Sequence, residues 1–137
     1  PLLMADSQQI REVKSYRPDL KNRIARAVCH GGRPQIEYYH DVPRRYSPFA
    51  YAFVRAHEYS HIVSGHLNCA GRNPDLAVSE RELGADCMAE RVIVERVQHG
   101  DFVVSYAAYL MSRARVPARN GYPSSDERAR NLYDNCS

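Results

Sequence analysis

Apolar and polar positions recur at helical spacing through most of the chain after residue 47. The clearest segment runs from residue 48 to about residue 64, where four rings follow one another at four-residue steps. They are Phe49, Phe53, His57 and His61. Ser47 and Pro48 form a typical helix start, and Gly65 is a typical stop. Because positions i and i+4 share one helix face, the apolar stripe leads directly into the two histidines and places them at the edge of the core.

Three more helices are expected downstream. The pattern predicts a helix from about residue 79 to residue 98, closed by Gly100, and another that Asp101 caps and that runs to residue 113. A loop with proline and glycine follows over residues 116–122. Ser124 and Glu127 match a capping box, which predicts a final helix to about residue 135.

The first third of the chain is less regular. Residues 5–28 carry apolar side chains at helical spacing, with an interruption at Arg17-Pro18, where the proline should break or restart a helix. Residues 34–40 are rich in strand-forming types and predict a short strand, either beside a substrate cleft or in the core. Residues 41–46 are expected to form a loop. The predicted fold class is therefore α+β, mainly helical, with a short sheet.

Composition limits the alternatives. A chain of 137 residues is expected to form one domain, residues 1–137, with a single core. The net charge of +3 is mild, and the basic residues are scattered rather than gathered in a run, which disfavours a nucleic-acid partner. The longest apolar run, residues 102–111, is too short to span a bilayer, so a soluble protein without a membrane span is expected.

Four cysteines are present, and no two of them form a CxxC pair, which argues against a zinc ribbon. An even number in so short a chain favours two disulfides in an exported protein, periplasmic or secreted. Four buried thiols in a cytoplasmic protein remain the alternative, since no signal peptide is visible and a processed chain would look the same. Cys69 and Cys87 flank the segment between the two central helices and are a candidate pair.

The pentapeptide at residues 57–61 (His-Glu-Tyr-Ser-His) has the spacing of a zinc-hydrolase half-site. Two imidazoles one helical turn apart can bind one zinc ion, and the carboxylate of Glu58 can reach a water molecule on that metal. The simpler interpretation is an amphipathic helix with two histidines on its polar edge. A third ligand and an orienting shell would decide between the two.

Glu82 is the best candidate for the third ligand. With Asp86 it places two carboxylates on one helix face, one for the metal and one for the free imidazole N–H of a ligand histidine. Small residues at positions 84, 85 and 89 would let the two helices approach closely. Glu82 could instead close a capping box with Ser79. His66 is a weaker candidate, because five residues after His61 it lies off the helix face.

Three ordered segments between residues 56 and 132 resemble the gluzincin clan of zinc metallopeptidases, and within it the HtpX and CAAX-prenyl-protease group. Residues 56–61 match that group's HExxH motif, and residues 82–86 match its ExxAD motif. Residues 122–132 resemble a further segment of the group, although Tyr122 stands where the family usually has histidine. The resemblance implies a minimal, soluble, zincin-like fold with its short sheet beside the active-site helix.

The same resemblance implies roles for individual residues. His57, His61 and Glu82 would bind Zn²⁺, with Glu58 as general base and Asp86 as the partner of a ligand histidine. An oxyanion donor is also needed. Tyr122 and Arg128 are the first candidates, because both lie in the third matching segment; His99, Tyr106 and Tyr109 are the others.

The predicted function is hydrolysis of peptide bonds in a peptide or protein substrate by a zinc metalloendopeptidase, with a regulatory partner left open. The alternative is a zinc-stabilised binding or regulatory module that does not catalyse a reaction. An intact Glu58 argues against that alternative, because a structural zinc site gains nothing from a general base and usually has four protein ligands. A helical interaction domain with chance histidines is a third, weaker alternative.

Overall fold

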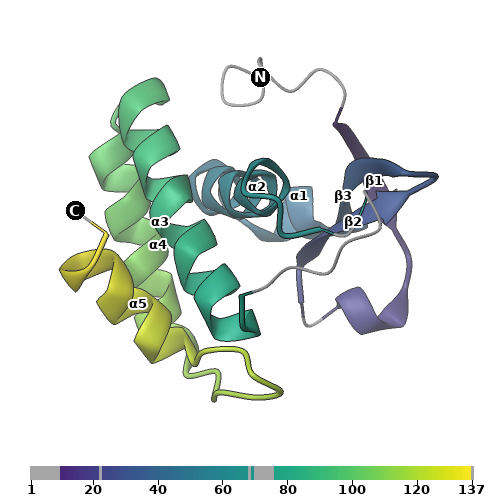
Figure 1. The fold of residues 1–137 in the computed structure, drawn as a ribbon. Coiled ribbons are helices and arrows are strands. Elements are labelled where there is room, and N and C mark those ends of the chain that lie inside the picture. The colour runs from purple at the N-terminus through teal and green to yellow at the C-terminus, as the bar shows by residue number, and fades with distance from the viewer. Residues whose placement is uncertain (1–9, 22, 68, 70–75, 137) are drawn as a thin grey trace.

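The computed structural model describes residues 10–21, 23–67, 69 and 76–136, and these form an α+β fold (Figure 1). A small sheet lies on one side, and helix α2 (Pro48–Val63) crosses the middle of the molecule. Three helices cover the other side of α2: α3 (Val78–Arg96), α4 (Gly100–Ala114) and α5 (Ser125–Asp134). The expected α+β class is confirmed, and the sheet packs against α2, which carries both histidines.

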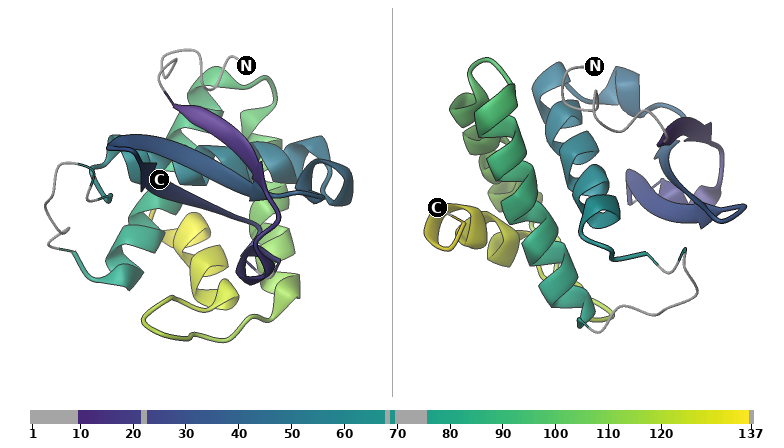
Figure 2. Two further views of the ribbon diagram at one scale, coloured as in Figure 1. Left: turned by 90° about the vertical axis from the view of Figure 1, so that its right-hand side faces the viewer. Right: turned by 45° about the horizontal axis from the view of Figure 1, so that its top comes forward.

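The sheet has three strands in the order β1-β3-β2 (Figure 2). They are β1 (Arg11–Ser15), β2 (Ala25–His30) and β3 (Arg33–Tyr39). Strand β3 is central, parallel to β1 and antiparallel to β2. Gly31 and Gly32 join β2 to β3 with φ values of 59° and 77°. Positive φ at both positions is what a tight hairpin turn requires, and it explains the glycine pair.

The helix expected over residues 5–28 is wrong where the structure describes it; residues 5–9 lie outside the described part. The segment forms β1, a 3-10 turn η1 (Pro18–Leu20) and β2. The expected break is at the right place, because Pro18 begins η1. Ile24 then reverses the chain into β2 with a positive φ of 72°, which is unusual for a β-branched residue. Strand β1 is held by pairing with β3 further along the chain, and β2 by the hairpin that Gly31 and Gly32 close; the spacing of apolar residues reveals neither pairing.

The strand expected over residues 34–40 is confirmed as β3, and it is a core strand: Ile36 is completely buried and Tyr38 nearly so. The loop expected over residues 41–46 contains a single helical turn, α1 (Val42–Arg45). Val42 is buried in the core, so hydrophobic packing holds this turn in place.

Helix α2 lies at the centre of the hydrophobic core. Its apolar side packs Phe53, Ala56 and Tyr59 against a cluster to which the sheet and the other helices contribute. The sheet contributes Ala25, Ile36 and Tyr38, and the helices α3, α4 and α5 contribute Ala89, Ile93, Val103, Val104, Ala107, Ala108 and Leu132. Because α2 is covered on both sides, its two histidines are held on a rigid element.

The predicted starts of α2 and α5 are confirmed. The Ser47 hydroxyl accepts from the Ala50 N–H at the start of α2, and Ser124 and Glu127 form the expected capping box of α5. The prediction that Gly100 closes α3 is wrong, because α3 ends at Arg96 with Val97 as its C-cap residue. Gly100 instead begins α4, whose N-cap residue is His99, so Asp101 lies inside the first turn and does not cap the helix. Gly100 is required there, because a Cβ at this position would collide with the backbone of Ile93.

Within the described part of the chain, no helix is both long enough and apolar enough to cross a membrane.

Candidate metal centre

Helix α2 brings His57, Glu58 and His61 to the boundary between the core and a cavity. All three are buried, with 5%, 9% and 8% of their surface exposed. They are placed there by the packing of α2, whose apolar face lies against the sheet on one side and against α3 and α4 on the other.

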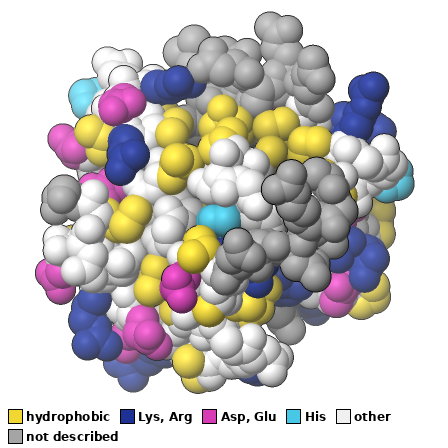
Figure 3. Space-filling model, viewed as in Figure 1, with side chains coloured by type: hydrophobic (Ala, Val, Ile, Leu, Met, Phe, Trp, Pro, Cys, Tyr) yellow, Lys and Arg dark blue, Asp and Glu magenta, His cyan; other side chains and the backbone are white. Residues whose placement is uncertain are grey.

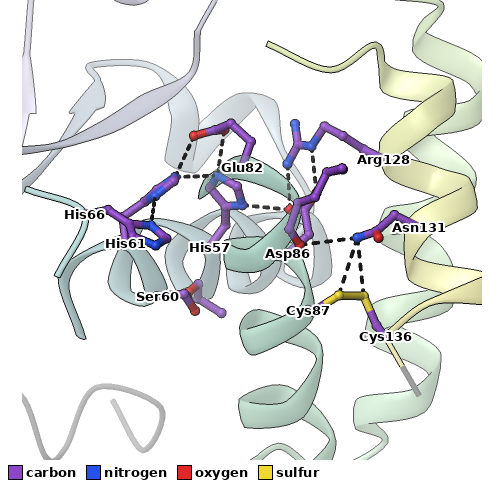
Figure 4. A network of polar contacts seen from close by, with 12 residues as sticks. His57, Ser60, His61, His66, Glu82, Asp86, Cys87, Arg128, Asn131 and Cys136 are labelled. Atoms are coloured by element: carbon purple, nitrogen blue, oxygen red, sulfur yellow. Dashed lines mark hydrogen bonds and ion pairs between the residues drawn. A yellow bond between two sulfur atoms is a disulfide. The ribbon is translucent and has the colours of Figure 1, made fainter. Parts of the chain in front are cut away.

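Helix α3 places Glu82 opposite the two histidines (Figure 4). A Glu82 carboxylate oxygen lies 2.8 Å from His61 Nε2, and the other lies 3.2 Å from His57 Nε2. The two Nε2 atoms are 3.1 Å apart. The alternative interpretation of Glu82 as part of a capping box is wrong, because the N-cap of α3 is Ala77 and no side chain caps this helix.

Close packing of α2 and α3 makes this approach possible. Ala85 and Ala89 are completely buried, as expected for small residues at the contact between the helices. Gly84 does not serve this purpose, because it is exposed and a Cβ there would meet open space.

Asp86 orients His57. Its carboxylate lies 2.7 Å from His57 Nδ1 and receives two hydrogen bonds of 2.8 Å from the Arg128 guanidinium on α5. When Asp86 accepts the Nδ1 proton, the lone pair of His57 Nε2 points toward Glu82 and His61 (Figure 4). Arg128 compensates the charge of Asp86, which has no exposed surface at all.

The neighbouring charges favour the ionised forms of four side chains in this cluster: His57, Glu82, Asp86 and Arg128. Burial disfavours the ionised form of each side chain, but the neighbouring groups together have the larger effect. The Asp86 and Glu82 carboxylates raise the pKa of His57 to about 10. The two histidines hold the pKa of Glu82 far below its usual range, and Arg128 with His57 lowers the pKa of Asp86. The nearby carboxylates, Asp86 foremost, raise the pKa of Arg128.

The geometry fits a zinc ion. Ligands held tetrahedrally at about 2.0–2.1 Å from one zinc lie roughly 3.3 Å apart. The three potential ligand atoms are 2.8 to 3.2 Å apart, and the group formed by His57, His61 and Glu82 is the only such triad among the described residues. Two imidazoles and one carboxylate are also a common ligand set of hydrolytic zinc, with a fourth position left for water.

The ligand group opens into a cavity of about 970 Å³. Its lining residues come from β2 and the segment before it, from the five helices α1 to α5, and from the loop between α4 and α5. Glu58 lines the cavity beside the histidines. The strand next to the cavity is β2, at the edge of the sheet; of the two places left open for β3, the core is the one observed.

No protein-family model, curated protein or solved structure matches this chain. The case for the site therefore depends on its own geometry.

Three of the five candidate oxyanion donors, Tyr122, Arg128 and Tyr106, line the cavity. Tyr122 is exposed, and its hydroxyl accepts a 3.0 Å hydrogen bond from Arg23. Its phenolic proton remains available to another acceptor. The Arg128 Nε and Nη2 atoms donate to Asp86. Nη1 is the Arg128 nitrogen that does not bond to Asp86. Of the remaining candidates Tyr106 lines the cavity, whereas His99 and Tyr109 are not among the lining residues.

His66 has a role that the sequence did not indicate. It is not part of the ligand triad; instead its Nδ1 lies 3.0 Å from His61 Nδ1, on the other side of that ring from Glu82. Burial lowers the pKa of His66, so its ring is neutral near pH 7. In the neutral ring, Nδ1 can accept a hydrogen bond from His61 Nδ1–H. His66 therefore does for His61 what Asp86 does for His57.

Two disulfides are present, Cys29–Cys69 and Cys87–Cys136, so the suggested pairing of Cys69 with Cys87 is wrong. The second bridge lies next to Asp86 and ties the end of α5 to α3. Asn131 on α5 donates to the Leu83 carbonyl and contacts both sulfur atoms of this bridge (Figure 4). Because disulfides form and persist in oxidising compartments, the two bridges indicate such an environment for this protein.

Proposed function

We propose that this protein is a zinc-dependent metallopeptidase of the gluzincin type. One observation carries the proposal: two imidazole Nε2 atoms and the Glu82 carboxylate converge at a cavity that Glu58 also lines. The convergence joins helices α2 and α3, so chance placement of two histidines on one helix does not account for it. The two disulfides support the further proposal that the protein is exported.

Each residue has a distinct task in the proposed reaction. His57, His61 and Glu82 would hold the metal, which when bound would supply Lewis-acid chemistry for a water molecule and a carbonyl group. Glu58 would act as the general base, accepting a proton from the attacking water and returning it to the leaving amine. Tyr122 donates its free phenolic proton toward the oxyanion, and Arg128 holds Asp86 against His57.

The alternative, a zinc-stabilised module without activity, has less support. That class usually has four protein ligands. His66, the candidate for the fourth position, contacts His61 at Nδ1, away from the ligand triad. A buried general base beside a sizeable cavity is also without purpose in a structural site.

The substitution Glu58→Gln tests the proposal. We expect wild-type protein to bind one zinc per chain and to cleave peptides in a mixed-sequence library, as read by mass spectrometry. Glu58→Gln keeps the size of the side chain but removes the base, so zinc content should stay the same while cleavage falls at least about 100-fold.

Glu95→Gln is the matched control, since Glu95 is exposed on α3 and does not line the cavity. It should cleave like wild type. Zinc binding without cleavage by the wild type would instead favour the module without activity, and cleavage by Glu58→Gln at the wild-type rate would reject the role of Glu58.

A further inference from the structure

The cavity beside the metal centre is rich in arginine. Six arginines line it: Arg23, Arg26, Arg45, Arg81, Arg119 and Arg128. The acidic residues in the same lining are Glu58 and Glu82, and the latter already contacts both histidines. An excess of cations of this size inside a cavity attracts anionic groups, because partly enclosed charges are screened less than charges on an open surface.

Half of these arginines are neutralised by neighbours outside the lining. They pair as Arg26 with Glu37, Arg45 with Asp41, and Arg128 with Asp86. Their charges serve the fold and the metal centre, so they are poor candidates for substrate binding.

The other three, Arg23, Arg81 and Arg119, form no ion pair with any carboxylate in the described parts of the chain. Arg23 donates to the Tyr122 hydroxyl and lies over that ring, 5.6 Å from its centre. Arg81 precedes the ligand Glu82 on α3, and Arg119 lies in the loop between α4 and α5. These three guanidinium groups come from three separate parts of the fold and line the same cavity.

We infer that the cavity selects peptides that carry acidic side chains near the bond to be cut. The inference rests on the proposed peptidase function and adds its substrate class. Arg81 and Arg119 are the specificity-determining residues, and Arg23 contributes from the segment before β2. Guanidinium groups bind carboxylates with paired hydrogen bonds, so they favour glutamate or aspartate over their amides by geometry as well as by charge.

A peptide fits these observations better than a nucleic acid. Nucleic-acid sites present a continuous basic stripe on the outer surface. On the face seen in Figure 3, Lys and Arg side chains are dispersed among acidic ones. The three unpaired arginines instead line the cavity, where Arg81 is half-buried and Arg23 and Arg119 are exposed at its solvent side. Apolar residues such as Phe53 and Leu110 line the same cavity.

Binding to zinc-loaded Glu58→Gln protein provides the first test, because this variant should hold a peptide without cutting it. Three labelled peptides of one scaffold carry Glu, Gln or Lys at the positions flanking the cleavage site. We expect the Glu peptide to bind about tenfold more tightly than the Gln peptide, and the Lys peptide to bind weakest, by fluorescence anisotropy. The preference should shrink as salt rises to about 0.5 M.

Arginine variants in the same background assign the effect to residues. The double change Arg81→Gln and Arg119→Gln should reduce the Glu-over-Gln preference to about twofold or less, with zinc content unchanged. Arg91→Gln is the matched control, since Arg91 is exposed on the same helix as Arg81 and does not line the cavity. It should retain the full preference. Equal affinity for the three peptides, or equal loss in both variants, would overturn the inference.

Cleavage by the wild type separates this inference from the function it rests on. If peptides are cut without regard to charge, the peptidase proposal stands and the acidic preference is wrong. If the Glu58→Gln variant prefers the Glu peptide while the wild type cuts none of the three, the acidic preference stands and the peptidase proposal fails. If an oligonucleotide of equal charge displaced the labelled Glu peptide as effectively as unlabelled Glu peptide does, that result would also overturn the preference for peptides.

Discussion

At the scale of single residues, each histidine of the candidate metal site has its own supporting partner. Asp86 fixes His57 through Nδ1, and His66 contacts His61 through the same ring atom. The two supports differ in charge: one is a buried carboxylate compensated by Arg128, and the other is a neutral imidazole. This difference makes the His61 side the easier one to test, because removal of His66 leaves no buried charge without a partner.

We expect His66→Leu to weaken zinc binding about 10- to 100-fold, because His61 then loses the acceptor that holds its Nδ1 proton. His66→Asn should retain most of the affinity, since an amide oxygen can take the place of the lost acceptor. Competition with a chromophoric chelator measures both. His30→Leu, a change at an exposed histidine of β2, should have no effect. Equal affinity of wild type and His66→Leu would show that the contact is incidental.

The sequence predicted residues of the site where spacing along one helix was sufficient. Residues 57–61 and 82–86 each place two side chains on a common face, and the structure brings the two faces together. Arg128 was expected in the site as an oxyanion donor. Its contact with Asp86 spans 42 residues and depends on how α5 packs on α3, which no local pattern encodes.

At the scale of elements, the helices were predictable and most of the sheet was not. Helices α2 and α5 carry their own start signals, Ser47-Pro48 and a capping box. Strand β1 is largely exposed and β2 is at the sheet edge, so neither shows the alternation of a half-buried strand. Their apolar residues fit a helical period by coincidence, and pairing with β3 decided the outcome.

The Cys87–Cys136 bridge fastens α5 to α3, so its removal should affect the metal centre as well as stability. The double change Cys87→Ser and Cys136→Ser should cost about 2–4 kcal/mol in the free energy of unfolding, measured in denaturant with chelator present. Because Arg128 on α5 holds Asp86, zinc affinity should fall too.

Arg130→Gln, an exposed change on α5, is the control for this double variant. It should alter neither quantity. Loss of stability with unchanged zinc affinity would mean that α5 keeps Arg128 in place without the disulfide.

At the scale of the whole molecule, stability of the metal-free protein should depend on pH in two directions. Asp86 and Glu82 have lowered pKa values, so their contribution is present above the unfolded values of about 4 and is lost as the pH falls further. His57 has its pKa raised to about 10, so its contribution is complete below about 6.5 and is lost as the pH rises toward 10. The chelated protein should therefore be most stable between about pH 4.5 and 6.5.

Zinc should remove the alkaline loss, because the metal replaces the proton at His57. Thermal unfolding between about pH 6 and pH 9 checks this. The midpoint temperature of unfolding should fall with rising pH when a chelator is present, and should stay level or rise when zinc is present. A midpoint independent of pH in chelator would contradict the charged state assigned to His57.

The contact between Arg23 and Tyr122 bears on how fast a substrate could enter and leave the proposed peptidase. It connects the segment before β2 with the loop between α4 and α5, two walls of one cavity, through a hydrogen bond that is open to solvent. Such a bond is worth about 1 kcal/mol, and loop motions that break it occur within nanoseconds to microseconds. In the proposed peptidase, the two walls would thus separate and rejoin many times within one turnover, so this contact would not limit how fast a long peptide enters from the side and leaves.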